Sequence, residues 1–322
     1  MKHTPFQKAL SLTAALAVLF ILMAGTAGAA GKFQEKFEKT VPLPKDGKVD
    51  ISNISGQIIV ASWSQGEVRI EAVKYSDASS EAKARENAAK VTIEVTTEGN
   101  VVRIETKYPR GGGIFGGESV DVTVEYKLTI PQEAGLKAKN ISGEIVAEGV
   151  GGHADLDAVS GDIMLRTAAK GAECNSVSGD VTVTGVTGDV FVKSVSGDVR
   201  ARQIKGSIVA ESVSGELELV EVSEASVVRA KALSGGIVYR GSINKAGTYT
   251  LKSHSGEVEM FLPAASAFDF EVSTFSGDIQ SDFEMATEDL RESGKELRGV
   301  INGGGAAVKL SSFSGDIRLK KT

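Results

Sequence analysis

A glycine that returns every eighteen residues is the feature that most restricts what this chain can fold into. It stands in the motif Ser-Gly-Asp/Glu, and the first five copies keep the interval without exception, at Gly143, Gly161, Gly179, Gly197 and Gly215. Later copies follow at intervals of 20, 21, 21 and 38 residues, at Gly235, Gly256, Gly277 and Gly315. Internal repetition at a period of this size is typical of stacked, solenoid-like architectures.

Apolar residues stand at fixed offsets from each glycine. In the third copy they are Val177, Val181 and Val183, two residues before the glycine and two and four residues after it. Spacing of two places side chains on one face of a strand, so we expect all three to face a shared interior. The same expectation covers Val195 and Val213, which take the place of Val177 in the next two copies.

One such unit cannot bury its apolar face alone, whereas stacked copies pair their backbones and share a core. The sequence therefore predicts an all-β fold, a parallel β-solenoid (β-helix) with about 18 residues per coil over residues 132–322. We expect a polar excursion loop near 281–298. Residues 31–131 would form a small β-rich capping region with one short helix near 77–90, capped by Asp77. A β-sandwich of hairpins is the alternative.

The first thirty residues read as a secretory signal peptide. Lys2 and Lys8 precede an uncharged apolar run from Ala9 to Met23, and small residues follow as far as Ala30. The run is shorter than the roughly 20 residues of a membrane span, although an uncleaved anchor is the alternative. We therefore expect an exported protein, periplasmic, cell-surface or secreted, that contacts a membrane only through residues 1–30 if they are retained.

Composition and charge exclude several classes of function. The chain has 36 Lys and Arg against 42 Asp and Glu, a net charge of −6, which does not suit the phosphates of a nucleic acid. The single Cys174 permits no internal disulfide, and its place in the repeat predicts a small core residue. His153 and His254 have no neighbours at metal-ligand spacing. The glycine-rich stretch 109–119 is expected to be a flexible connection.

The acid of the motif is the main candidate for a functional group. Its copies would stack into a column of carboxylates, Glu144, Asp162, Asp180, Asp198 and Glu216. Such a column could bind calcium, although the additional glycines of calcium-binding nonapeptide repeats are missing. The simpler interpretation is structural, with a turn at the glycine and local hydrogen bonds from the serine and the acid. The residues expected in that turn are Ser142, Gly143, Ser160, Gly161, Ser178, Gly179, Ser196, Gly197, Ser214 and Gly215.

An enzyme that cleaves glycans on a β-helix would need a unique cluster of carboxylates in one groove, or carboxylates with Arg or Lys. Asp155 and Asp157 offer carboxylates, and Arg200 and Arg202 follow Asp198 closely. Repeated, equivalent acids are what turns produce in any case, and no unique pair stands out. We therefore predict no catalytic residues, no cofactor and no enzymatic activity.

The chain resembles the bacterial "putative adhesin" family of β-strand-repeat proteins, a domain of unknown function, and is similar to the head domains of autotransporter adhesins. The resemblance rests on VDISNISGQIIVASWSQGEVRIEAVKY, the Ala-rich helix, NVVRIETKYP, the SGD/SGE repeats and the closing FSGDIRL. It implies a β-solenoid in the bacterial envelope and supplies no catalytic residues.

These observations together predict an exported, non-enzymatic solenoid that offers a repetitive surface for adhesion or scaffolding. Its partner would be an envelope or cell-surface component, a glycan or a protein, and not a nucleic acid; the oligomeric state stays open. The alternatives are an envelope-glycan hydrolase or lyase and, third, a calcium-stabilised structural rod.

Overall fold

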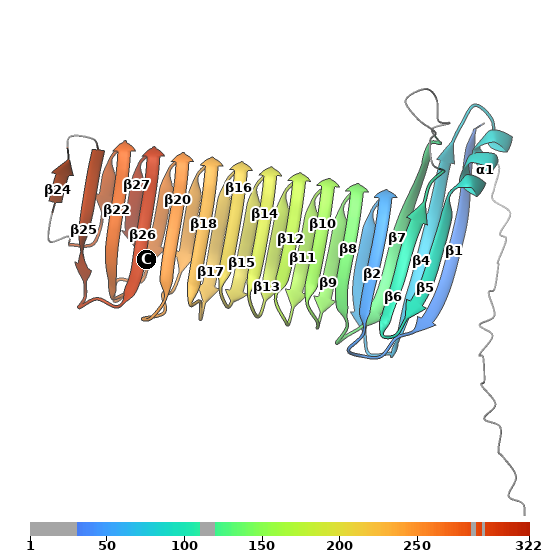
Figure 1. Ribbon diagram of the computed structural model, residues 1–322, viewed down its shortest axis with the longest axis horizontal. Helices are drawn as coiled ribbons and strands as arrows, with labels where there is room; N and C mark the ends of the chain where they lie inside the picture. The colour runs from blue at the N-terminus through green and yellow to red at the C-terminus, as the bar shows by residue number, and fades with distance from the viewer. Residues whose placement is uncertain (1–30, 110–119, 285–287, 292–293) are drawn as a thin grey trace, which may run out of the picture.

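The computed structural model describes residues 31–109, 120–284, 288–291 and 294–322. The expected signal peptide, residues 1–30, and residues 110–119 of the glycine-rich stretch lie outside the described residues. Figure 1 shows one long rod, with the helix α1 (Glu81–Lys90) at one end and the strands β24 (Glu288–Arg291) and β25 (Gly294–Ile301) at the other. Among the described residues, no helix has the length and apolar character needed to cross a membrane.

The described strands form two sheets that run the length of the rod. The 13-stranded sheet consists, in spatial order, of β1 (Lys32–Pro42), β4 (Glu67–Asp77), β7 (Val122–Pro131), β3 (Ile58–Trp63), β9 (Ile145–Val150), β11 (Ile163–Ala168), β13 (Val181–Val186), β15 (Val199–Lys205), β17 (Leu217–Ser223), β19 (Ile237–Gly241), β21 (Val258–Leu262), β27 (Ile317–Lys321) and β23 (Ile279–Ser281). The 14-stranded sheet consists of β24, β25, β22 (Phe268–Ser276), β26 (Ala306–Ser314), β20 (Thr248–Ser255), β18 (Val227–Ser234), β16 (Ile208–Ser214), β14 (Val190–Ser196), β12 (Ala172–Ser178), β10 (Ala154–Ser160), β8 (Gly135–Ser142), β2 (Lys48–Ser55), β6 (Val101–Lys107) and β5 (Thr92–Glu98).

Successive coils pair in parallel and in register. Ala154 in β10 lies opposite Ala172 in β12, eighteen residues further along the chain. On the other sheet, Ile163 in β11 lies opposite Val181 in β13. Hairpins would pair their strands antiparallel, so the predicted parallel β-solenoid is confirmed and the β-sandwich is excluded. The same two sheets also contain β2 and β3, so coils already begin upstream of residue 132.

One continuous apolar core lies between the two sheets. Val181 and Val183 are completely buried in it, as predicted from their offsets. Cys174 is also 0% exposed, which confirms it as a core residue, and burial raises the pKa of its thiol well above the usual range. Each fully buried aliphatic side chain contributes about 1.5–3 kcal/mol to stability, so stacking the repeat is what stabilises it.

The spatial order of the coils departs from the sequence order at both ends of the rod. The first coil in the chain, β2 with β3, lies between β6 with β7 and β8 with β9. The last coil in the chain, β26 with β27, lies between β20 with β21 and β22 with β23. The C-terminus therefore lies on the penultimate coil rather than at the tip of the rod (Figure 1).

The excursion near 281–298 is not only a loop, contrary to expectation. β25 pairs antiparallel with β22, and β24 pairs antiparallel with β25, so this segment extends the 14-stranded sheet. β25 occupies the edge of β22 that faces the tip of the rod. β26 therefore pairs with the opposite edge of β22, where it lies between β22 and β20 and is parallel to both.

Antiparallel strands also end the rod at the N-terminal side. β1 pairs with β4, β4 with β7, and β5 with β6 through a turn at Gly99 and Asn100. The predicted helix is present as α1, with ion pairs of Arg85 with Glu81 and of Lys90 with Glu86. Its N-cap is Ser80 rather than Asp77, because the Ser80 hydroxyl accepts the Lys83 N–H at 3.2 Å.

Candidate binding surface

A row of mostly apolar side chains runs along the outside of the 14-stranded sheet, one from each coil. We call this row the exterior ladder; in spatial order it consists of Ile54, Ile141, Val159, Val177, Val195, Val213, Leu233, His254, Phe313 and Phe275. Ile141 is 50% exposed, Leu233 51% and Phe275 57%. Val195 is half-buried and His254 is polar, but most of the row consists of exposed apolar side chains. Such a row marks a candidate surface for binding a partner.

The exterior ladder corrects the expectation that Val177, Val195 and Val213 face the core. Val177 is 47% exposed, whereas Ser176 beside it is 3% exposed. The chain turns a corner at the glycine, so the alternation of the strand before it does not continue into the strand after it. Counted back along β12, the inward residues are Ser176, Cys174 and Ala172, and Val177 therefore faces out.

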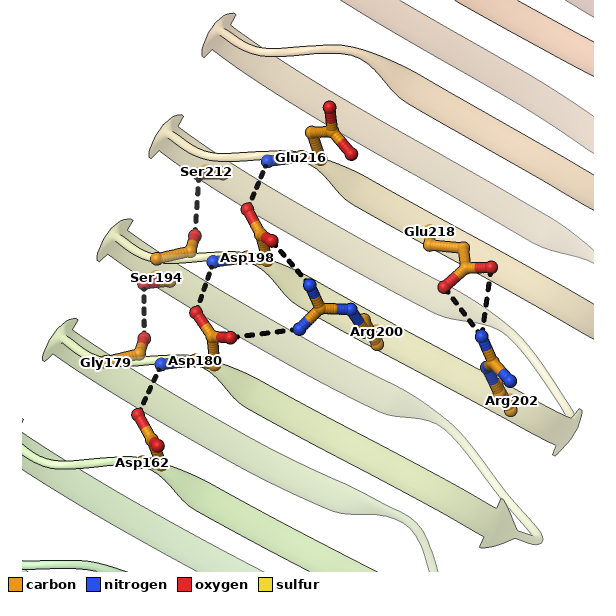
Figure 2. A network of polar contacts seen from close by, with 11 residues as sticks. Asp162, Gly179, Asp180, Ser194, Asp198, Arg200, Arg202, Ser212, Glu216 and Glu218 are labelled. Atoms are coloured by element: carbon orange, nitrogen blue, oxygen red, sulfur yellow. Dashed lines mark hydrogen bonds and ion pairs between the residues drawn. The ribbon is translucent and has the colours of Figure 1, made fainter.

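Small polar side chains fill the inward position next to the corner. Ser194 Oγ donates to the Gly179 carbonyl of the preceding coil at 3.0 Å, and Ser176 Oγ does the same to Gly161 at 3.1 Å. Ser212 Oγ repeats this bond to the Gly197 carbonyl at 3.4 Å, and Figure 2 shows the bond from Ser194 to Gly179. Ser253, Ser312 and Thr274 repeat the arrangement toward the C-terminal end. These hydroxyls satisfy buried carbonyls, so they hold the corner rather than a ligand.

The motif acids sit just beyond the corner and bind the turn of the next coil. The Asp162 carboxylate accepts the Asp180 N–H, Asp180 accepts from Asp198, and Asp198 accepts from Glu216, each at 2.9 Å (Figure 2). The first acid of the column, Glu144, accepts the side-chain amide of Gln57 at 2.7 Å. Their contacts are those of turn residues. Within the described residues, no three His, Cys, Asp or Glu side chains are grouped to hold a metal ion.

The motif serines Ser142, Ser160, Ser178, Ser196 and Ser214 all have exposed side chains. The hydroxyls that hold the corner belong instead to the residues two positions earlier. The motif glycines take part through their backbones: a Cβ on Gly197 would lie 2.2 Å from the Gly179 carbonyl oxygen. Only glycine lets neighbouring turns approach this closely.

Several charges on the outer face of the 13-stranded sheet pair with one another. Arg200 donates to Asp180 at 2.9 Å and to Asp198 at 2.6 Å, and Arg202 meets Glu218 at 2.9 Å (Figure 2). The Asp198 N–H, and then Arg200, lower the pKa of Asp180 below its usual value. Asp155 and Asp157, the other carboxylates considered for catalysis, lie on the 14-stranded sheet, paired with Lys137 and Lys139.

A hollow of about 420 Å³ interrupts the acid column on the 13-stranded sheet, where Gly236 replaces the acid of its coil. Asp198, Glu216 and Glu257 line it together with Arg200. Asp198 is already held by Arg200, and Arg318 lies against Glu257. Two of the three carboxylates are therefore already engaged in ion pairs within the protein.

Two shallow grooves follow the exterior ladder on the other face. One, of about 880 Å³, lies along the N-terminal half and is lined by ladder residues together with Lys139, Asp157 and Phe191. The second, of about 430 Å³, continues along the C-terminal half beside Lys231, Leu233 and His254. Two hollows with largely apolar walls therefore follow the ladder, which makes this face the candidate binding surface.

Sequence reasoning missed this surface because it took the residue two before each glycine as inward. His254 was the available signal. It takes that place in its repeat, and an imidazole in a core column is improbable on physical grounds, so the whole column is better interpreted as exposed. The second signal was the serine that stands three residues before the motif glycine in several repeats, as Ser176, Ser194 and Ser212. A hydroxyl that recurs at one position of a repeat is explained by a buried side chain that donates a hydrogen bond.

A model of one protein family, Toastrack DUF4097, matches residues 48–320, which covers most of the described rod. The chain belongs to this family. The match confirms the resemblance to a family of β-strand-repeat proteins whose domain has no known function. None of the curated proteins compared with this Toastrack chain matches it significantly.

Several solved structures are similar to the chain at low sequence identity. They include a putative cell adhesion protein from Clostridium sporogenes, 11% identical, which covers 90% of this chain and 100% of its own with a TM-score of 0.31. A match to a putative adhesin from Bacteroides fragilis is 12% identical and covers 89% of this chain and 97% of that protein, with a TM-score of 0.40. A match to a putative lipid binding protein from Parabacteroides distasonis is 10% identical and covers 89% of this chain and 96% of that protein, with a TM-score of 0.42. Likeness at this level says nothing about what this chain binds.

Proposed function

We propose that this Toastrack protein is an exported, non-enzymatic solenoid that binds or scaffolds a component of the cell envelope through the exterior ladder. The observation that carries the proposal is the ladder itself. It places one side chain per coil along the rod, most of them apolar, on the face that also has grooves. Export rests on the apolar start of the chain, residues 9–23.

The regular stacking of coils suits a long binding surface rather than a catalytic pocket. Equivalent side chains recur about every 4.8 Å along a stack of paired strands, so a partner would meet the same contact many times. Many weak, equivalent contacts sum to firm attachment without any single deep site. This is the form of recognition expected of adhesion or scaffolding.

Retention of the full chain by isolated envelope fractions tests the proposal. We expect the protein to sediment with one fraction, and a variant with Val177→Thr and Val213→Thr to be retained less. A matched variant, Thr182→Val with Thr184→Val, alters side chains on the outer side of β13 in the other sheet and should be retained like the unchanged protein.

Sugar release into the supernatant is measured in the same tubes, with and without calcium. Release that follows the purified protein would contradict the non-enzymatic proposal and direct attention to the hollow at Gly236. Retention that requires calcium would instead favour the acid column as a cation-dependent element.

A further inference from the structure

Three cations beside the C-terminal half of the exterior ladder have no partner. Arg229, Lys231 and Lys252 are exposed on the outer side of β18 and β20. Lys231 lies directly opposite Lys252 in the strand pairing. Within the part of the chain that the structure describes, none of the three makes an ion pair or a side-chain hydrogen bond, whereas nearby Lys193 pairs with Glu211 and Lys309 with Glu271.

The ladder carries its bulkiest side chains along the same half. Leu233, His254, Phe313 and Phe275 follow one another in space, where the N-terminal half has Ile and Val. The rings of His254 and Phe313 stack with centroids 4.9 Å apart, and those of Phe313 and Phe275 do the same. A ridge of ring edges therefore stands beside unpaired cations on an otherwise acidic protein.

The stacked rings argue against a sugar as the partner of this half. Sugars pack on open aromatic faces, but Phe313 has a ring stacked on each side, and the stack covers one face each of His254 and Phe275. A second copy of the chain is the other candidate occupant, because exposed acids without an ion pair among the described residues, such as Glu173, are present on the same face. The experiments below distinguish it from a lipid surface.

We propose that the C-terminal half of the exterior ladder, with Arg229, Lys231 and Lys252, binds the surface of an anionic lipid bilayer. Phe and Leu side chains enter the boundary between headgroups and acyl chains, and the cations meet the headgroup phosphates. This inference rests on the proposed use of the ladder face for binding, and it names the class of partner.

A dye at a chosen position shows which part of the rod meets the bilayer. The full chain carries an environment-sensitive dye on Ser255→Cys or, as the control, on Ser160→Cys; both serines take the same place in their coils and are exposed. Cys174 is fully buried and does not compete for the dye. Residues 1–30 are present in every variant, so their own affinity for lipid is common to all comparisons.

Vesicles of phosphatidylcholine, with or without phosphatidylglycerol, provide the probe. We expect a blue shift at Ser255→Cys with the anionic vesicles, a much smaller shift with phosphatidylcholine alone, and little shift at Ser160→Cys. Added salt should weaken the response, since screening acts on exposed charges. Equal shifts at both positions, or equal shifts with both kinds of vesicle, would overturn the proposal.

Charge and apolar contact are then separated by substitution. Lys231→Glu with Lys252→Glu should lower the apparent affinity for anionic vesicles, measured from the dye response, by roughly 30-fold or more. Each cation removed costs about 1 kcal/mol of binding free energy. The matched control, Lys127→Glu with Arg166→Glu, changes net charge equally at exposed positions on the 13-stranded sheet and should change little. Leu233→Thr with Phe313→Thr should weaken binding about tenfold and retain the salt dependence.

Failure of this inference is distinguishable from failure of the proposed function. If Leu233→Thr with Phe313→Thr loses retention by envelope fractions while vesicles give no response at Ser255→Cys, the ladder binds a partner that is not lipid. Concentration-dependent dimers that this variant abolishes would identify a second copy as the occupant, and would also overturn the lipid proposal.

Discussion

The two outer faces of the rod use the same repeat in opposite ways. In the middle of the 13-stranded sheet, Arg200 bridges Asp180 and Asp198, so the charges of neighbouring coils are paired within the protein. On the 14-stranded sheet, the exterior ladder leaves large apolar groups in water, and Lys231 and Lys252 stay unpaired. Ion pairs join coils on both faces, but the second face also exposes a row of large apolar groups, whose burial by a partner would be favourable.

The corner between the faces should be the most sensitive position. Gly197→Ala places a methyl group 2.2 Å from the Gly179 carbonyl oxygen, which forces neighbouring coils apart. We expect a loss of about 3 kcal/mol or more in the free energy of unfolding, measured by urea denaturation. Gly99→Ala is the control, because nothing lies within 4 Å of its Cβ; its positive φ of 61° should cost only about 1 kcal/mol. Equal losses would argue against close packing at the corner.

The inward and outward valines of one coil sharpen the comparison. Val181 is 0% exposed and Val177 is 47% exposed, although they lie four residues apart. Val181→Ala should cost about 2 kcal/mol, because it leaves a cavity in the core. Val177→Ala should change the stability by less than about 0.5 kcal/mol. Thermal unfolding of the two variants measures the difference, and similar melting temperatures would contradict the assigned corner.

The buried hydroxyls should have an intermediate effect. Ser194→Ala removes the donor to the Gly179 carbonyl, which should cost about 1 kcal/mol in urea denaturation. Ser196→Ala, at the exposed motif serine two residues later, is the matched control and should be nearly neutral. If Ser196→Ala costs more, the motif serine holds the turn after all.

The smallest effect is expected for the paired charges of the 13-stranded sheet. Because hydrogen bonding lowers the pKa of Asp180, its carboxylate stabilises the fold at neutral pH, and this contribution disappears as pH falls through the folded-state pKa, below 3.8. Asp180→Asn should cost less than about 1 kcal/mol at pH 7, since the pair is half exposed. The difference from the unchanged protein should disappear in acid. Asp46→Asn, in an exposed loop, should show no such pH dependence.

Much of the fold was predictable because the repeat carries its own evidence. The alternation of residues after the glycine placed Val181 and Val183 inside correctly, and the helix expected near residues 77–90 is present as α1. The candidate surface was not predictable in the same way. Side chains alternate between inward and outward only within one strand, and the corner at the glycine interrupts this alternation. Val177 was therefore assigned to the wrong side of the sheet.

The sequence by itself determined that this chain stacks: a glycine every eighteen residues, with apolar residues in register, leaves few ways to bury the core other than coil on coil. Only the tertiary structure decided which coil lies beside which at the ends, because every coil offers a similar pairing edge. The antiparallel return through β25 selects the site where β26 inserts. The tertiary structure also brought Leu233, His254, Phe313 and Phe275 together beside unpaired cations. Phe275 precedes Phe313 in the sequence but follows it along the rod, because β26 lies between β20 and β22.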